Sequence, residues 1–227
     1  KVINLGVLAA AKIGVIDDLG AEIWRAHTGA LFWFGEGLAK EKSGRLLVFN
    51  LLVDSINRHE SELAHATVFA GFIRSIHDSA PAQSRDLLER ALEISSLKRH
   101  SVYLLASIPI APWGSARLLH LAQGGELEAW RFEHLSLGRR HEAVPDNEFA
   151  SLLSAVNALE DGCLSTLELL YMRFFEAATR KYVPNEDIQA TARDTIRKLV
   201  AQHRGVFKSA PEYKIDEIMA VGFGTAA

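Results

Sequence analysis

The sequence predicts an all-α protein, built as a right-handed α-solenoid of antiparallel helix hairpins. Prolines recur at intervals of 31, 33 and 39 residues, and a helical segment follows each of them: Pro81, Pro112, Pro145 and Pro184. A Leu-Leu pair recurs in the helix after each of the first three prolines, at Leu87-Leu88, Leu118-Leu119 and Leu152-Leu153. No segment shows the clear apolar–polar alternation between turns that marks a strand. One hairpin every 30 to 45 residues, roughly, is typical of helical repeats that bury their apolar faces against one another.

The first helix is expected over residues 2–14, a segment that is apolar on nearly every side. A helix without a polar face is usually buried on several sides. Two placements follow from this pattern. The helix lies at the centre of the N-terminal half, or it docks on a part of the protein outside this sequence.

Three further helices are expected before the first repeat. Asp17 and Asp18 predict the start of a helix that runs to Leu38, because carboxylates favour the positive end of the helix dipole. Three glycines weaken this helix, whose C-terminal half is expected to be broken or closely packed: Gly29, Gly35 and Gly37. The next two helices are expected over residues 44–59 and 63–78.

The first two hairpins follow the same plan. In the first, Ser79 is expected to cap a helix with Pro81 in its first turn, where a missing N–H costs nothing. Its partner helix ends at Pro109. The second hairpin turns at Gly124-Gly125, and its returning helix carries Trp130 on an apolar stripe, which predicts that this ring lies in the core.

The third hairpin turns at Asp161-Gly162, and Ser165 and Glu168 then form the pattern of a capping box. A last helix follows the fourth proline and ends near His203. In the first and third hairpins the apolar pairs of the two helices are 17 residues apart: Leu88 to Leu105, and Leu153 to Leu170.

These patterns divide the chain into three ranges. Residues 1–78 form an N-terminal helical region that is expected to be continuous with the array, 79–204 hold the proline-marked hairpins, and 205–227 form a C-terminal cap or linker. The alternative to a solenoid is an irregular helical bundle whose loops happen to use proline.

Antiparallel helix pairs of this length, with a proline near the start of the first helix, resemble the HEAT-like and armadillo-like α-repeat superfamily. The resemblance covers about residues 79–203 and is one of pattern, without a diagnostic motif. It implies a curved scaffold that binds partners, usually proteins and occasionally nucleic acid. It carries no catalytic residues to transfer.

Composition narrows the classes of protein further. The net charge of -3 shows no basic excess of the kind that nucleic-acid binders carry. The single cysteine, Cys163, excludes an intrachain disulfide and favours a reducing compartment. No apolar run reaches the roughly 18 residues that span a bilayer. We therefore expect a cytoplasmic protein without membrane contact and, from its first and last residues, a segment of a longer chain.

The sequence contains no catalytic constellation, so we expect a protein that is not an enzyme and that holds no cofactor or metal. Glu62 and His65 have the Glu-x-x-His spacing of di-iron bundles, but no second copy exists. Cys163 lies beside a turn glycine, with His141 and His203 distant in sequence, and lacks the context of a nucleophile.

Two basic pairs are the candidate binding residues. Arg139-Arg140 and Arg180-Lys181 end consecutive returning helices, so the hairpin geometry predicts that they are neighbours on one edge. Together they would grip a phosphate or an acidic segment. The alternative is that these cations serve the C-termini of helices, each contributing about 0.3–1 kcal/mol through the dipole. Trp113, at the start of a helix, is a candidate interface anchor.

The leading functional prediction is a non-enzymatic scaffold, or a sensor or regulatory module, that binds a protein partner or a neighbouring domain. A helical-repeat module that binds nucleic acid or phosphate along the edge of Arg139 and Arg180 is the alternative.

Overall fold

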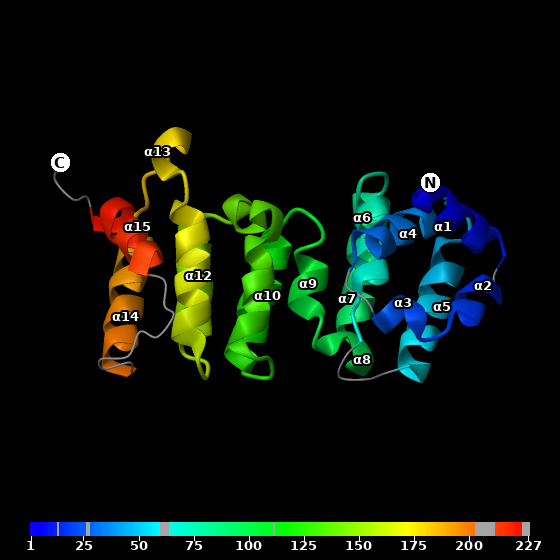
Figure 1. Cartoon of the computed structure of the whole chain (residues 1–227), viewed down its shortest axis with the longest axis horizontal. Helices are drawn as coiled ribbons and strands as arrows, with labels where there is room; N and C mark the ends of the chain where they lie inside the picture. The colour runs from blue at the N-terminus through cyan, green and yellow to red at the C-terminus, as the bar shows by residue number, and fades with distance from the viewer. Residues whose placement is uncertain (13, 26–27, 60–63, 111, 203–211, 224–227) are drawn as a thin grey trace. The chain divides into compact units, whose positions relative to one another are not determined.

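The computed structural model describes residues 1–12, 14–25, 28–59, 64–110, 112–202 and 212–223. Every regular element in these ranges is a helix (Figure 1), so the prediction of an all-α fold is confirmed. The contacts divide the chain into two compact units, Lys1–Ile108 and Pro109–Ala227. The helices after Pro81 and before Pro109 therefore belong with those that precede them.

Unit 1 is organised around α6, which contacts α3, α4, α7 and α9. Most of its side chains are buried, including Phe69 and Phe72, whose rings meet edge to face. The nine helices of the described part of this unit are α1 (Val2–Ala11), α2 (Gly14–Leu19), α3 (Glu22–Arg25), α4 (Gly29–Leu38), α5 (Arg45–Arg58), α6 (Thr67–His77), α7 (Pro81–Leu92), α8 (Ser95–Lys98) and α9 (Ser101–Leu105).

The backbones of α1 and α4 touch through glycines. A Cβ atom added to Gly37 would lie 2.1 Å from the carbonyl oxygen of Ile3, and one added to Gly6 would lie 2.2 Å from that of Phe34. Both distances are far below any real carbon–oxygen contact, so neither position accepts a side chain without moving a helix.

The other side of α4 repeats this arrangement against α6. A Cβ on Gly35 would lie 2.0 Å from the Val68 carbonyl oxygen, and one on Gly71 would lie 2.0 Å from that of Phe32. The prediction of one helix from Asp17 to Leu38 is wrong, because α2, α3 and α4 divide this range. Within α4 the glycines serve close packing, as expected for the C-terminal half.

Helix α1 faces its neighbours with its smallest residues. Its buried residues are Gly6 and Ala9, whereas Leu5 is 56% exposed and Leu8 is 62% exposed. The prediction that this helix lies at the centre of the N-terminal half is therefore wrong, because its large side chains face outward. Glycine contact with α4 explains the difference, because only a narrow strip of small residues fits against so close a backbone.

Unit 2 stacks its helices in hairpin order. Helix α11 contacts α10 and α14, while α12 contacts η1, α11 and α14. Figure 1 shows α12 and α14 side by side, and α15 also contacts α12. The described elements are α10 (Pro112–Gly124), the 3₁₀-helix η1 (Ala129–Ala143), α11 (Asp146–Asn157), α12 (Gly162–Phe174), α13 (Ala177–Arg180), α14 (Glu186–Gln202) and α15 (Glu212–Phe223).

Two returning helices depart from the predicted plan. The first is broken into α8 and α9, and the second is the 3₁₀-helix η1, interrupted at residues 137–139 by non-helical backbone. The prediction that Trp130 lies in the core is wrong, because the tighter 3₁₀ winding changes which side chains share a face. Its ring is 52% exposed and the Arg131 guanidinium lies 4.5 Å from its centre.

Two predicted caps are also wrong. Helix α12 begins at Gly162, four residues before the start that a cap at Ser165 predicts, so Ser165 lies inside it and donates a hydrogen bond to Glu133 (2.8 Å). Ser79 does not cap α7; its hydroxyl accepts a hydrogen bond from the buried Arg45 (2.7 Å). In both cases a tertiary partner competes successfully with the local cap.

Replacing Gly37 by alanine tests the contact between α1 and α4. We expect Gly37→Ala to lower the free energy of unfolding by about 1–3 kcal/mol, because the new methyl group forces backbones apart. Gly29→Ala in the same helix is the matched control, since its Cβ would meet nothing nearer than 4.0 Å. It should leave stability unchanged or raise it by about 0.4–1 kcal/mol. Urea unfolding followed by circular dichroism measures both, and equal midpoints would contradict the close contact.

Candidate functional site

The structure brings two of the sequence-predicted site residues together, at the end of α12. Arg139, from η1, and Arg180, from α13, both donate to Oε1 of Glu142, at 2.5 Å and 2.8 Å. Arg139 also donates to Glu176 at 3.3 Å. The two arginines are thus close together, as predicted, but the carboxylates of Glu142 and Glu176 lie between and beside them.

The same arginines donate to the last carbonyl groups of α12. Arg180 Nη2 lies 2.5 Å from the Arg173 oxygen and 2.7 Å from the Phe175 oxygen, and Arg139 Nη2 lies 3.3 Å from the latter. A helix leaves its last carbonyl oxygens without intrahelical partners, and cations are favoured there. The contacts therefore support the structural alternative, in which these cations serve the C-terminus of a helix.

The charges of this cluster are balanced locally. Burial alone would raise the pKa of Glu142, but the hydrogen bond from Arg139 and the positive charges of Arg139 and Arg180 hold it below its ordinary value. The hydrogen bond to Glu142 in turn raises the pKa of Arg139. An incoming phosphate would have to displace carboxylates that already hold these guanidinium groups.

A buried arginine lies beneath the cluster. The Arg173 guanidinium donates to the His141 carbonyl (2.6 Å), the Val144 carbonyl (3.0 Å) and Asp146 (2.5 Å). It also lies over the rings of Phe149 and Tyr182, at 5.2 Å and 5.0 Å from their centres.

Tyr182 completes this buried network. Its hydroxyl donates to Asp146 at 2.9 Å, and burial raises its pKa to about 12. A phenol with so high a pKa stays protonated, so Tyr182 acts here as a hydrogen-bond donor and not as a base.

His141 is fully buried and stacks on Phe149. Its Nδ1 lies 3.1 Å from the Leu135 carbonyl oxygen, which can only accept, so Nδ1 carries the proton. Burial lowers the pKa of His141 and the charge of Arg173 lowers it further, against the Leu135 carbonyl and the Glu142 carboxylate, which raise it. The ring is therefore neutral in the folded protein at pH 7.

Left-handed backbone collects around this cluster. Arg139, Glu176 and Lys181 have φ angles of 59°, 57° and 55°, a region that residues other than glycine seldom adopt. Such conformations persist only where the surroundings hold them. Here the ion pairs and carbonyl contacts of the arginines provide that restraint.

Arg140, Lys181 and Trp113 are the remaining predicted site residues. Arg140 is half-buried, next to the interruption in η1. Lys181 is exposed and makes no hydrogen bond or ion pair with the residues that the structure describes. Trp113 is half-buried in the first turn of α10.

The metal and nucleophile candidates of the sequence find little support. Glu62 and His203 lie outside the described residues, and within the described ranges no three His, Cys, Asp or Glu side chains come close enough to hold a metal ion. Cys163 is buried, donates to Gln202 at 2.9 Å, and has a pKa raised by burial. None of the described helices has the length and apolar character needed to cross a membrane.

Sequence reasoning missed a groove on unit 1. A cavity of about 490 Å³ opens between α1 and the segment from α2 to α4, and apolar side chains dominate its lining. Leu5 and Leu8 form one wall, and Leu31 contributes to the other. Lys12 and Glu22 are its charged lining residues. The signal was present in the sequence, because a helix without a polar face cannot hide every apolar side chain against one neighbour.

Comparisons with protein-family models, with curated proteins and with solved structures gave no match.

Titration of His141 should appear in the stability of the protein. Because its folded-state pKa lies below the unfolded value of about 6.5, the unfolded chain binds the proton first as the pH falls. Its contribution is fully present above about pH 6.5 and is lost below it, at up to about 1.4 kcal/mol per pH unit. Denaturant unfolding between pH 7.5 and 5.5 should show a steeper loss for the wild type than for His141→Gln.

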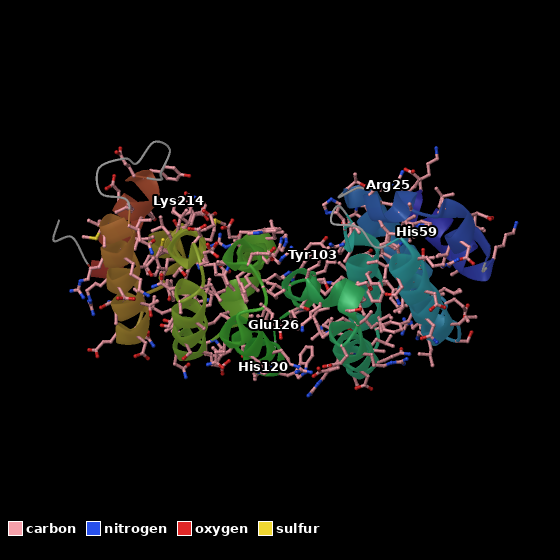
Figure 2. The ribbon with its side chains drawn as sticks, turned by 90° about the horizontal axis from the view of Figure 1, so that it is seen from below. Arg25, His59, Tyr103, His120, Glu126 and Lys214 are labelled. Atoms are coloured by element: carbon pink, nitrogen blue, oxygen red, sulfur yellow. The ribbon has the colours of Figure 1, made fainter. Side chains whose placement is uncertain are left out.

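His120→Gln is the control for that experiment. His120 lies on α10, is labelled in Figure 2 and is exposed, so its replacement removes an imidazole without disturbing the buried network of His141. Parallel profiles for the wild type and His141→Gln would show that His141 is not held neutral by burial.

Proposed function

We propose that the chain is a non-enzymatic protein-interaction module of a larger cytoplasmic protein, and that a partner or neighbouring domain docks on the outward face of α1. The observation that carries this proposal is the reversed orientation of that helix, with Gly6 and Ala9 inward and Leu5 and Leu8 outward. Large contiguous apolar surface is rare on proteins that work alone and commonly marks an interaction site.

The groove beside α1 suits an apolar helix. Its lining is largely leucine, valine, isoleucine and phenylalanine, and a helix binds such a groove through side chains spaced three and four residues apart. Covering the exposed parts of Leu5 and Leu8 would contribute roughly 1–2 kcal/mol each. The sequence predicts a second placement for residues 2–14, in which the helix docks on a part of the protein outside this sequence. The proposed docking on α1 corresponds to that placement.

The proposal extends to the architecture. In unit 2, α11 lies between α10 and α14, and α12 contacts η1. In a stack of hairpins, the first helix of each hairpin packs against the first helices of its neighbours. The returning helices likewise pack against one another. This supports a right-handed α-solenoid resembling the HEAT-like superfamily, with the scaffold, sensor or regulatory role that such arrays serve.

Polar substitutions in α1 test the docking face. We expect Leu5→Gln combined with Leu8→Gln to weaken partner binding at least about 30-fold, because two apolar contacts are lost. Glutamine has nearly the helix propensity of leucine, so the fold should be kept. Leu46→Gln with Leu47→Gln on α5 is the matched control, since these side chains are 49% and 48% exposed and do not line the groove.

Affinity capture with mass spectrometry would identify the partner, and titration calorimetry with the purified partner would compare the three proteins. Equal affinity for all three would contradict the proposal. Binding of the wild type to phosphatidylcholine vesicles, lost in the α1 variant and without any protein partner, would assign the face to a membrane instead.

Nucleic-acid or phosphate binding at Arg139 and Arg180 is the second candidate, favoured by their proximity. Its weakness is that Glu142 and Glu176 already pair with Arg139. If the arginines serve α12 instead, Arg139→Glu with Arg180→Glu should lower stability without changing any nucleic-acid binding. An electrophoretic shift assay at low salt decides, and salt-sensitive binding that this variant abolishes would favour the second candidate.

A further inference from the structure

A second surface lies in unit 2, distant in sequence from α1. A cleft of about 620 Å³ opens between the segment after α10 and the turn that joins α11 to α12. Leu127 lies buried in its lining, and Leu159 is half-buried. Leu164 and Trp130 also line it and are 42% and 52% exposed. The cleft thus has an apolar floor and an accessible aromatic ring.

Carboxylates surround this floor. Five acidic side chains line the cleft and no basic side chain does: Glu126, Glu128, Glu133, Glu160 and Asp161. Glu126, labelled in Figure 2, lies just beyond the end of α10. The whole chain has a net charge of only -3, so five acidic side chains without a basic one in a single cleft are a local excess of negative charge.

Two of these carboxylates have no cationic partner among the residues that the structure describes. Glu160 and Asp161 are exposed and form no ion pair with the residues that the structure describes. Asp161 precedes the first residue of α12, where an aspartate usually caps the helix, yet its side chain makes no capping hydrogen bond. Its position is nevertheless well defined, because a Cβ on the next residue, Gly162, would lie 1.9 Å from the Val156 carbonyl oxygen.

The chain itself shows how this surface holds a cation. The Arg131 guanidinium lies 4.5 Å from the centre of the Trp130 ring and donates to Glu128 at 2.5 Å. A planar cation held by an aromatic face and a carboxylate at once is a recurrent mode of arginine recognition. Trp130 remains half exposed with this contact in place.

We propose that the cleft binds a cationic segment of a partner protein, in which arginine or lysine side chains are interspersed with apolar ones. The apolar floor selects against a purely basic segment, and the carboxylates repel nucleic acid. Because no three acidic side chains in the described ranges converge as metal ligands do, the charges suit an extended chain with several cations better than one metal ion. This inference does not rest on the α1 surface.

The probe is a fluorescein-labelled peptide that alternates arginine with leucine, titrated with the full chain and followed by fluorescence anisotropy. We expect saturable binding that Glu160→Gln with Asp161→Asn weakens about tenfold, because two carboxylates that face the ligand are lost. Asparagine tolerates the left-handed backbone of residue 161, where φ is 52°, so the turn should be preserved.

Glu186→Gln with Asp187→Asn is the matched control. These side chains are exposed at the start of α14, close to Asp146 at the opposite end of α11 from the cleft. The control should bind as the wild type does, and so should Leu5→Gln with Leu8→Gln. A peptide of glutamine and leucine should not bind.

Absence of saturable binding at low salt would overturn the proposal, as would equal weakening by the cleft and control variants, which would indicate diffuse attraction only. Trp130→Ala supplies a second test that removes no charge, and unchanged affinity in that variant would also contradict the inference. Thermal unfolding of each variant confirms that a loss of binding does not reflect a loss of fold.

Discussion

The contact between Gly6 and Gly37 is the constraint on which unit 1 depends. Each residue faces the backbone of the other helix at a distance that admits no side chain. Close approach of this kind gains dispersion contacts along both backbones, but it requires small residues on the shared strip. Helix α1 therefore places Gly6 and Ala9 inward, and its leucines have no room against α4.

This arrangement links packing to function. An apolar helix normally hides its large side chains, and α1 instead hides its small ones. The exposed Leu5 and Leu8 then form a wall of the groove that extends to Leu31. Apolar surface of this kind is costly to leave in water, and the proposed occupant from a partner or neighbouring domain would cover it.

In unit 2, the arginines that stand out in the sequence are held in contacts within the fold. Arg139 and Arg180 are adjacent, but Glu142 neutralises them and the end of α12 receives their hydrogen bonds. Below them, Arg173 joins carbonyl groups and Asp146 in a buried network. The basic edge holds the irregular backbone that follows α12, whereas the acidic cleft has exposed carboxylates that face solvent.

The sequence predicted the all-helical class, because apolar periodicity and prolines are local signals, but it missed the breaks that separate α2 from α3 and α8 from α9. It also predicted that Arg139 and Arg180 are neighbours, because consecutive returning helices end on one edge. It did not predict the exposure of Trp130, since a 3₁₀-helix turns every three residues and alters the faces that periodicity assigns.

The groove and the acidic cleft were missed for a common reason. Leu5 looks like a core residue, and Asp161 looks like an ordinary turn residue, until the neighbouring helices are placed. Both surfaces are made by residues distant in sequence, such as Leu8 with Leu31, or Trp130 with Glu160. Patterns along a single helix contain no information about which residues of other helices will lie beside it.

Hydrogen exchange of the α1 amides, with and without the purified partner, tests the central claim most directly. If the outward face of α1 is a docking surface, exchange across residues 2–11 slows when the partner binds, because local opening of the helix then requires dissociation. Unchanged exchange in α1, with protection appearing on other helices, would contradict the claim.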